Sequence, residues 1–192
     1  MLRCRALVPL VLVAAIASAC AEPPDREIQQ AQSAIEAARA AGADIYAHDE
    51  FAAAQTALKN ANDAVTQRDY RLALNNALDA RERAQNAAKE AGERKIVARG
   101  DADRAIAAAT AAVTEARTRL KAAESVRAAP RVVAEARRTI ASVEQAVQKA
   151  RTAHGHEDYM GAIQTANAAT ARLQGVARDL DAASTAPVRR RR

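Results

Sequence analysis

Alanine supplies most of the apolar side chains of this 192-residue chain, and this feature limits its fold more than any other. Alanine has the highest helix propensity of the amino acids but buries very little surface. Aromatic residues make up only 2% of the chain, and there is no tryptophan to fill a large core. Such a sequence forms long helices with thin cores and cannot easily line a deep pocket. The composition therefore predicts an all-α protein and argues against an enzyme.

Residues that start and stop helices divide the chain into five predicted helices. Gly42 and Gly155 end two of them, Pro130 suits the first position of another, and Asp69 and Asp158 are natural N-caps. The predicted helices cover residues 25–41, 48–66, 70–126, 130–154 and 159–183, with a connection at 43–48.

Two of these predicted helices have distinctive features. Asp25 can cap the first helix, with Glu27 favourably placed in its first turn. The third is unusually long because no proline interrupts residues 70–129. Gly100 could bend this long helix, and Asp101 could cap a restart.

Apolar residues recur at spacings of three and four in each predicted helix, which places them on one face. We expect these faces to form an elongated helical bundle of two antiparallel hairpins that share the long central helix. Closely approaching alanine faces would hold this bundle together. The residues expected to face inward are Ile28, Ala31, Ile35, Ala38, Phe51, Gln55, Leu58, Ala61 or Asn62, Val65, Leu74, Ala77, Ala84, Ala88, Val133, Ala136, Ile140, Val143, Val147, Ala150, Ile163, Ala166, Leu173 and Leu180.

An offset of 89 residues relates the two halves of the chain. Asp69-Tyr70 matches Asp158-Tyr159, and Arg83 matches Arg172. The second copy would carry about seven extra residues upstream, roughly two helical turns, which keeps the apolar stripe in phase. A true duplication and chance matches in an alanine-rich chain both remain open. The predicted parts are a helical domain at residues 25–100, a second hairpin and degenerate repeat at 101–183, and a disordered basic tail at 184–192.

The N-terminus has the pattern of an export signal. Arg3 and Arg5 precede an apolar run at residues 7–16, and small residues follow before Cys20. A charged start, a short apolar run and a small-residue cleavage site are typical of a secretory signal peptide, here residues 1–19. The apolar run is too short to cross a bilayer as a stable helix, which needs about 20 apolar residues.

The segment Ala17-Ser18-Ala19-Cys20 resembles the lipobox of bacterial lipoproteins, although leucine is commonest where Ala17 stands. The resemblance implies cleavage between Ala19 and Cys20, and lipidation of Cys20. Residues 20–24 would then form a lipid-anchored tether, and several acyl chains would anchor it stably. Ala21 favours the outer membrane, because an aspartate there tends to retain such lipoproteins in the inner membrane. The alternative is an ordinary signal peptide with a chance cysteine.

The segment from Pro24 to about Lys95 resembles the domain-of-unknown-function family 4398, whose domains occur in bacterial envelope lipoproteins. The residues that carry the resemblance are Ala38 to Gly42, Tyr46 to Phe51, Leu58, Ala61, Arg68-Asp69-Tyr70 and the alanines of residues 73–88. The family usually has proline where His48 stands and leucine where Phe51 stands. The resemblance implies a helical, envelope-located domain and brings no catalytic residues.

The remaining candidate sites are few. His154 to Asp158 is the only cluster of metal-capable groups, and we interpret it as a helix end, a glycine stop and an N-cap rather than a metal site. Tyr70 and Tyr159 more readily pack their rings at turns than bind a ligand. The tail residues Arg189, Arg190, Arg191 and Arg192 could contact anionic surfaces such as lipopolysaccharide, or form a solvated tail.

These observations predict a lipid-anchored periplasmic protein with a structural or protein-interaction role at the outer membrane. It would contact the membrane through its N-terminal lipid, bind no nucleic acid, need no cofactor and perform no catalysis. Because the core is thin, a homo-oligomer is plausible. The alternative is a tethered adaptor that recruits an envelope enzyme or contacts lipopolysaccharide through its basic tail.

Overall fold

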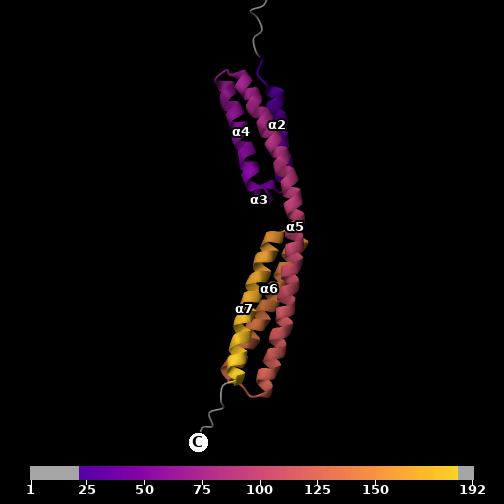
Figure 1. Ribbon diagram of the computed structural model, residues 1–192, viewed down its shortest axis with the longest axis vertical. Coiled ribbons are helices and arrows are strands. Elements are labelled where there is room, and N and C mark those ends of the chain that lie inside the picture. The colour runs from indigo at the N-terminus through magenta and orange to yellow at the C-terminus, as the bar shows by residue number, and fades with distance from the viewer. Residues whose placement is uncertain (1–21, 186–192) are drawn as a thin grey trace, which may run out of the picture. The chain divides into compact units, whose positions relative to one another are not determined.

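The computed structural model describes residues 22–185, and this part of the chain is all-α, with six helices and no strand (Figure 1). The helices are α2 (Asp25–Ala40), α3 (Ala43–Tyr46), α4 (His48–Thr66), α5 (Tyr70–Ser125), α6 (Pro130–Gly155) and α7 (Tyr159–Thr185). The all-α class expected from the composition is therefore confirmed.

The chain divides into two compact units, with the boundary between Glu93 and Arg94 inside α5. Unit 1, which ends at Glu93, contains α2, α3, α4 and the first part of α5. Unit 2, which starts at Arg94, contains the second part of α5 together with α6 and α7. In each unit three long helical segments lie side by side, so part of α5 completes each predicted hairpin as a three-helix bundle (Figure 1).

The core of unit 1 consists largely of alanine. Ala31, Ala57 and Ala80 come from α2, α4 and α5 and pack in one cluster at 0 to 6% exposure. On α5 the alanines recur at helical spacing and are all fully buried: Ala73, Ala77, Ala80, Ala84, Ala87 and Ala91. Because alanine side chains are short, helices can pack closely along these faces. The predicted stripe of α2 is confirmed, since Ile28, Ala31, Ile35 and Ala38 are all buried.

The predicted inward face of α4 is partly wrong. Gln55 and Asn62 are exposed, and Leu58 and Val65 are only half-buried. The buried residues of α4 are Phe51, Ala54, Ala57, Ala61 and Ala64. On α5, the predicted Leu74 and Ala88 are likewise only half-buried. The close approach of the helices selects the small residues, and the larger apolar side chains lie at the edges of the contact.

Unit 2 has a core with larger side chains. The predicted stripes of α6 and α7 are confirmed at Ala136, Ile140, Val143, Ala166 and Leu173, among others. Val133 and Ile163 are the exceptions and are half-buried. The largest fully buried side chains among the described residues are Leu173, Leu180 and Val143, all in this unit.

Two local predictions need correction, and a third is confirmed. The predicted connection at 43–48 contains the short helix α3, because Gly42 takes a left-handed φ of 85° and lets a new turn bury Ala43 and Tyr46. Asp25 does not cap α2, since it already lies in the first turn and Pro24 holds the cap position. The predicted long helix is confirmed, because α5 runs from Tyr70 to Ser125 without a restart at Asp101.

The turns before Asp69 and Asp158 have the same geometry at the 89-residue offset. Asp69 N–H donates to the Ala64 carbonyl, and Asp158 N–H donates to the Ala153 carbonyl, both at 2.9 Å. The preceding residues, Arg68 and Glu157, have φ values of 60° and 63°. Both helices thus end in the same left-handed turn, which satisfies carbonyls that the helix end would leave free.

Both aspartates cap the helix that follows, as the sequence predicts. The Oδ1 atom of Asp69 accepts the N–H of Leu72 at 3.0 Å, and Oδ1 of Asp158 accepts the N–H of Gly161 at 2.9 Å. The α6 helix has 26 residues and α4 has 19, which matches the seven extra residues expected for the second copy.

Candidate functional site

The residues of the predicted lipidation and cleavage site, Ala19 and Cys20, lie outside the described residues, as do Arg189, Arg190, Arg191 and Arg192. Their roles therefore stay predictions from the sequence. Among the helices of residues 22–185, none is sufficiently long and apolar to span a membrane.

The segment from His154 to Asp158 joins the three helices of unit 2. His154 lies at the end of α6, and its Nε2 atom is 3.0 Å from Oδ1 of Asp103 on α5. Its ring packs edge-to-face on Tyr159 of α7, with 5.2 Å between the ring centroids. Asp158 caps α7. The side chains of this segment thus make separate structural contacts, and no group of three metal-capable side chains converges within residues 22–185.

The two tyrosines differ in their surroundings. Tyr159 is 7% exposed and packs on His154, so its predicted packing role at the turn is confirmed. Tyr70 occupies the matching position of unit 1, at the start of α5, and is half-buried. The histidine contact explains part of this difference, because the residue that matches His154 in unit 1 is Val65.

Glu157 forms an ion pair that joins the α6–α7 turn to α5. Its Oε2 atom accepts a hydrogen bond from Nζ of Lys95 at 2.6 Å. This hydrogen bond, helped by the charges of Lys95 and Arg99, holds the pKa of Glu157 below its ordinary value of 4.5. A carboxylate whose pKa is lowered in the folded state stabilises the fold only at pH values at which it is ionised.

We expect Glu157→Gln to lower the melting temperature at neutral pH and to have no effect in acid. The contribution of the ion pair is fully present above pH 4.5, the ordinary pKa of the carboxyl, and is lost as the pH falls through the lower folded-state pKa. The measurement is the melting temperature of both proteins from pH 2 to 7. In a Lys95→Met background the same substitution should have a smaller effect. A difference in melting temperature that did not change with pH would contradict the stabilising role of the Lys95–Glu157 ion pair.

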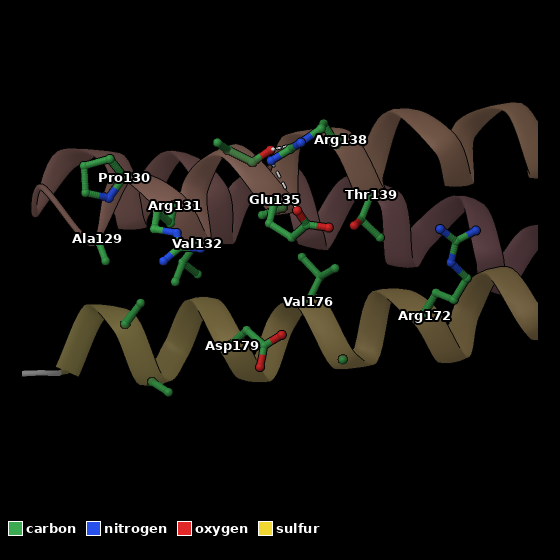
Figure 2. Close-up of a pocket in the computed structure, with 15 residues that line it drawn as sticks. Ala129, Pro130, Arg131, Val132, Glu135, Arg138, Thr139, Arg172, Val176 and Asp179 are labelled. Carbon is green, nitrogen blue, oxygen red and sulfur yellow. Dashed lines mark hydrogen bonds and ion pairs between the residues drawn. The ribbon is translucent and has the colours of Figure 1, made fainter.

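A groove with a volume of about 1040 Å³ lies between α6 and α7 (Figure 2). Its apolar floor includes Val132, which is half-buried, and Ala136 and Val176, which are 4% and 8% exposed. The full lining is Ala129, Pro130, Arg131, Val132, Ala134, Glu135, Ala136, Arg138, Thr139, Arg172, Gly175, Val176, Asp179, Ala182 and Ala183. The groove is open along one side, so it suits a surface that docks rather than a small molecule that must be enclosed.

Charged side chains of both signs border this groove. Arg138 lies 3.3 Å from Glu135 on the same helix, and Arg172 donates a 3.4 Å hydrogen bond to the Ser142 hydroxyl. Figure 2 shows Arg131 on α6 and Asp179 on α7, on opposite sides of the groove. Sequence reasoning missed this site. The signals that could have revealed it are the extra two turns of α6 and Gly175 inside α7.

Ion pairs elsewhere on the surface link neighbouring helices. Arg83 of α5 binds Asp79 at 2.9 Å and Glu50 of α4 at 3.5 Å, and these contacts raise its pKa, the hydrogen bond to Asp79 contributing most. In unit 2 the pKa of Arg119 is raised by hydrogen bonds to Glu115 and then to Asp181 of α7. Both shifts favour the charged form of the arginine, as expected for structural ion pairs.

Comparison of the chain with models of protein families, with curated proteins and with solved structures finds no match.

Proposed function

We propose that this chain is a bacterial envelope lipoprotein with a non-catalytic structural or protein-interaction role at the periplasmic face of the outer membrane. The observation that carries the proposal is the order of features at the N-terminus. The lipobox-like segment ends at Cys20, and the helical body begins at Asp25, only a short tether later. A lipid on Cys20 would thus hold a folded helical domain close to the membrane surface.

The surface chemistry supports a non-catalytic role. No polar or charged side chain is classed as buried among residues 22–185. The pKa values that depart from their ordinary values belong to Arg83, Arg119 and Glu157, and each shift favours the charged form. General acids and bases more often need the opposite arrangement, in which burial brings the pKa towards neutral pH.

The open groove of unit 2 supports an interaction role. It combines an apolar floor with a charged border, and these are the features of a surface that excludes water in its centre and orients a partner at its edge. Ala21 supports a location in the outer membrane, because in the lipoproteins that this N-terminus resembles an aspartate at this position favours the inner membrane.

The anchoring is tested by Cys20→Ser in the full chain, followed by separation of the outer-membrane, inner-membrane and soluble fractions of a bacterial host. We expect wild type in the outer-membrane fraction with a lipid-modified N-terminal peptide in mass spectrometry. The Cys20→Ser protein should lack the modification, keep its uncleaved N-terminus and leave the outer-membrane fraction.

Cys4→Ser is the matched control, because Cys4 lies in the predicted signal peptide and should be removed with it. It should behave as wild type in both measurements. If the Cys20→Ser protein stayed in the outer membrane as firmly as wild type, the proposal of a lipid anchor would be wrong.

A further inference from the structure

On its α6 side, the groove of unit 2 is lined mainly by the first turns of that helix, which are the extra turns that α4 of unit 1 lacks. In unit 1 the α3 turn buries Ala43 at 0% and Tyr46 at 9% exposure. In unit 2 no helical turn lies between α5, which ends at Ser125, and α6, which begins at Pro130. Val132 is half-buried and Glu135 is exposed. Val132 and the exposed Ala134 and Ala182 thus leave apolar surface in contact with water along the groove, which costs free energy.

Gly175 leaves room for a close approach from outside the unit. It lies in the interior of α7 and lines the groove, and a Cβ atom added to it would meet no atom within 4 Å. A glycine inside a helix costs about 1 kcal/mol relative to alanine, yet no contact within unit 2 requires one here. Ala182 and Ala183, about two turns further along α7, are also small and line the groove, so the backbone of a docked helix could come close to α7.

The charges along the groove are suited to a surface of the same composition. Neither Arg131 nor Asp179 makes a side-chain ion pair or hydrogen bond within residues 22–185, and they extend from opposite sides of the groove (Figure 2). Three arginines and two carboxylates line the groove, so its net charge is small. A strongly anionic ligand would bring negative charge against the two carboxylates. A surface with one unpaired cation and one unpaired anion would instead form an ion pair with each of Asp179 and Arg131.

We propose that a second copy of this chain occupies the groove, with the α6–α7 face of each copy packed on the same face of the other. A twofold axis along the groove brings Arg131 of each copy beside Asp179 of the other, so the two unpaired charges form two equivalent ion pairs. Interfaces between identical chains commonly have this self-complementary arrangement. Val132, Ala134 and Ala182 of both copies then lose their contact with water, and Gly175 allows the helices to approach closely.

The first test measures self-association by sedimentation equilibrium of the purified full chain in density-matched detergent, at a large excess of micelles over protein. We expect a reversible dimer for wild type. Gly175→Leu should weaken dimerisation at least about tenfold, which corresponds to 1.4 kcal/mol, without loss of helical content. Gly92→Leu is the matched control, because Gly92 also lies in a helix with no atom near its would-be Cβ. It should dimerise as wild type does.

The second test uses charge reversal and does not depend on a change in packing. Arg131→Glu alone and Asp179→Arg alone should each dimerise about tenfold more weakly than wild type. A mixture of the two variants restores both ion pairs in the mixed dimer. Energy transfer between fluorescent proteins fused to the C-termini of the two variants should therefore recover to the wild-type level.

Three outcomes would overturn the proposal: a wild-type chain that stays monomeric, dimers that are insensitive to Gly175→Leu and to both charge reversals, or no recovery of energy transfer in the mixture. Dimerisation requires no lipid on Cys20, so Cys20→Ser tests the anchor separately from the groove.

Discussion

The Leu173→Ala substitution should lower the free energy of unfolding of unit 2 by about 2 to 5 kcal/mol. Leu173 is 2% exposed and belongs to a cluster with Ile140, Val143 and Val147 of α6. Its removal leaves a cavity that neighbouring alanines are too short to fill, so the cost should lie in the upper part of this range. The backbone amides of α6 and α7 report the loss directly, because their hydrogen exchange should become at least about thirtyfold faster.

Leu72→Ala is the control for this substitution. Leu72 is the same type of residue in unit 1, but 46% of it is exposed. Its truncation to alanine should therefore lower the free energy of unfolding of unit 1 by less than about 1 kcal/mol. If Leu173→Ala and Leu72→Ala had equal effects on their own units, the larger side chains of unit 2 would not form its core as described.

The Ala77→Leu substitution should destabilise unit 1 by about 1 to 3 kcal/mol, although leucine is more hydrophobic than alanine. Ala77 is fully buried on α5 and packs against Ile28 of α2 and Ala61 of α4. Three helices converge on it, so the added carbon atoms must push at least one helix away. Hydrogen exchange of the amides of α2 and α4 measures the effect.

Ala37→Leu is the matched control, because Ala37 lies on α2 with its side chain exposed to solvent. This change should leave exchange in unit 1 nearly unaltered. Faster exchange for Ala77→Leu alone would support close packing through alanine. If Ala77→Leu instead made exchange slower, the helices of unit 1 would have unfilled space between them, contrary to the described core.

Helix limits were predictable because the signals that set them are local. Pro130, Asp69 and Asp158 begin helices through their own backbone or side-chain chemistry, and the structure has helices beginning at or directly after them. The apolar stripe of α6 was also predictable, since valine and isoleucine mark one face against polar neighbours. Asp25 was predicted to be the N-cap of α2 but is its first helical residue. Pro24 occupies the cap position and makes no side-chain hydrogen bond there.

The face of α4 could not be predicted with the same accuracy. Alanine occurs on more than one side of this helix, so periodicity alone cannot decide between the stripe through Leu58 and the stripe through Ala57 and Ala61. The three-helix packing decides in favour of the alanines, since the closest helix approach admits only the smallest side chains. The single turn of α3 was missed because one turn is too short to show any period.

The sequence by itself determined the helical class, the positions of most helix ends and the two matching turns, because propensity and capping depend on residues close in the chain. Only the tertiary structure decided which alanines are buried, where α5 passes from one unit to the next, and that α6 and α7 leave a groove between them. These features depend on contacts between segments far apart in sequence, where a one-residue difference in the facing side chain changes how closely two helices can pack.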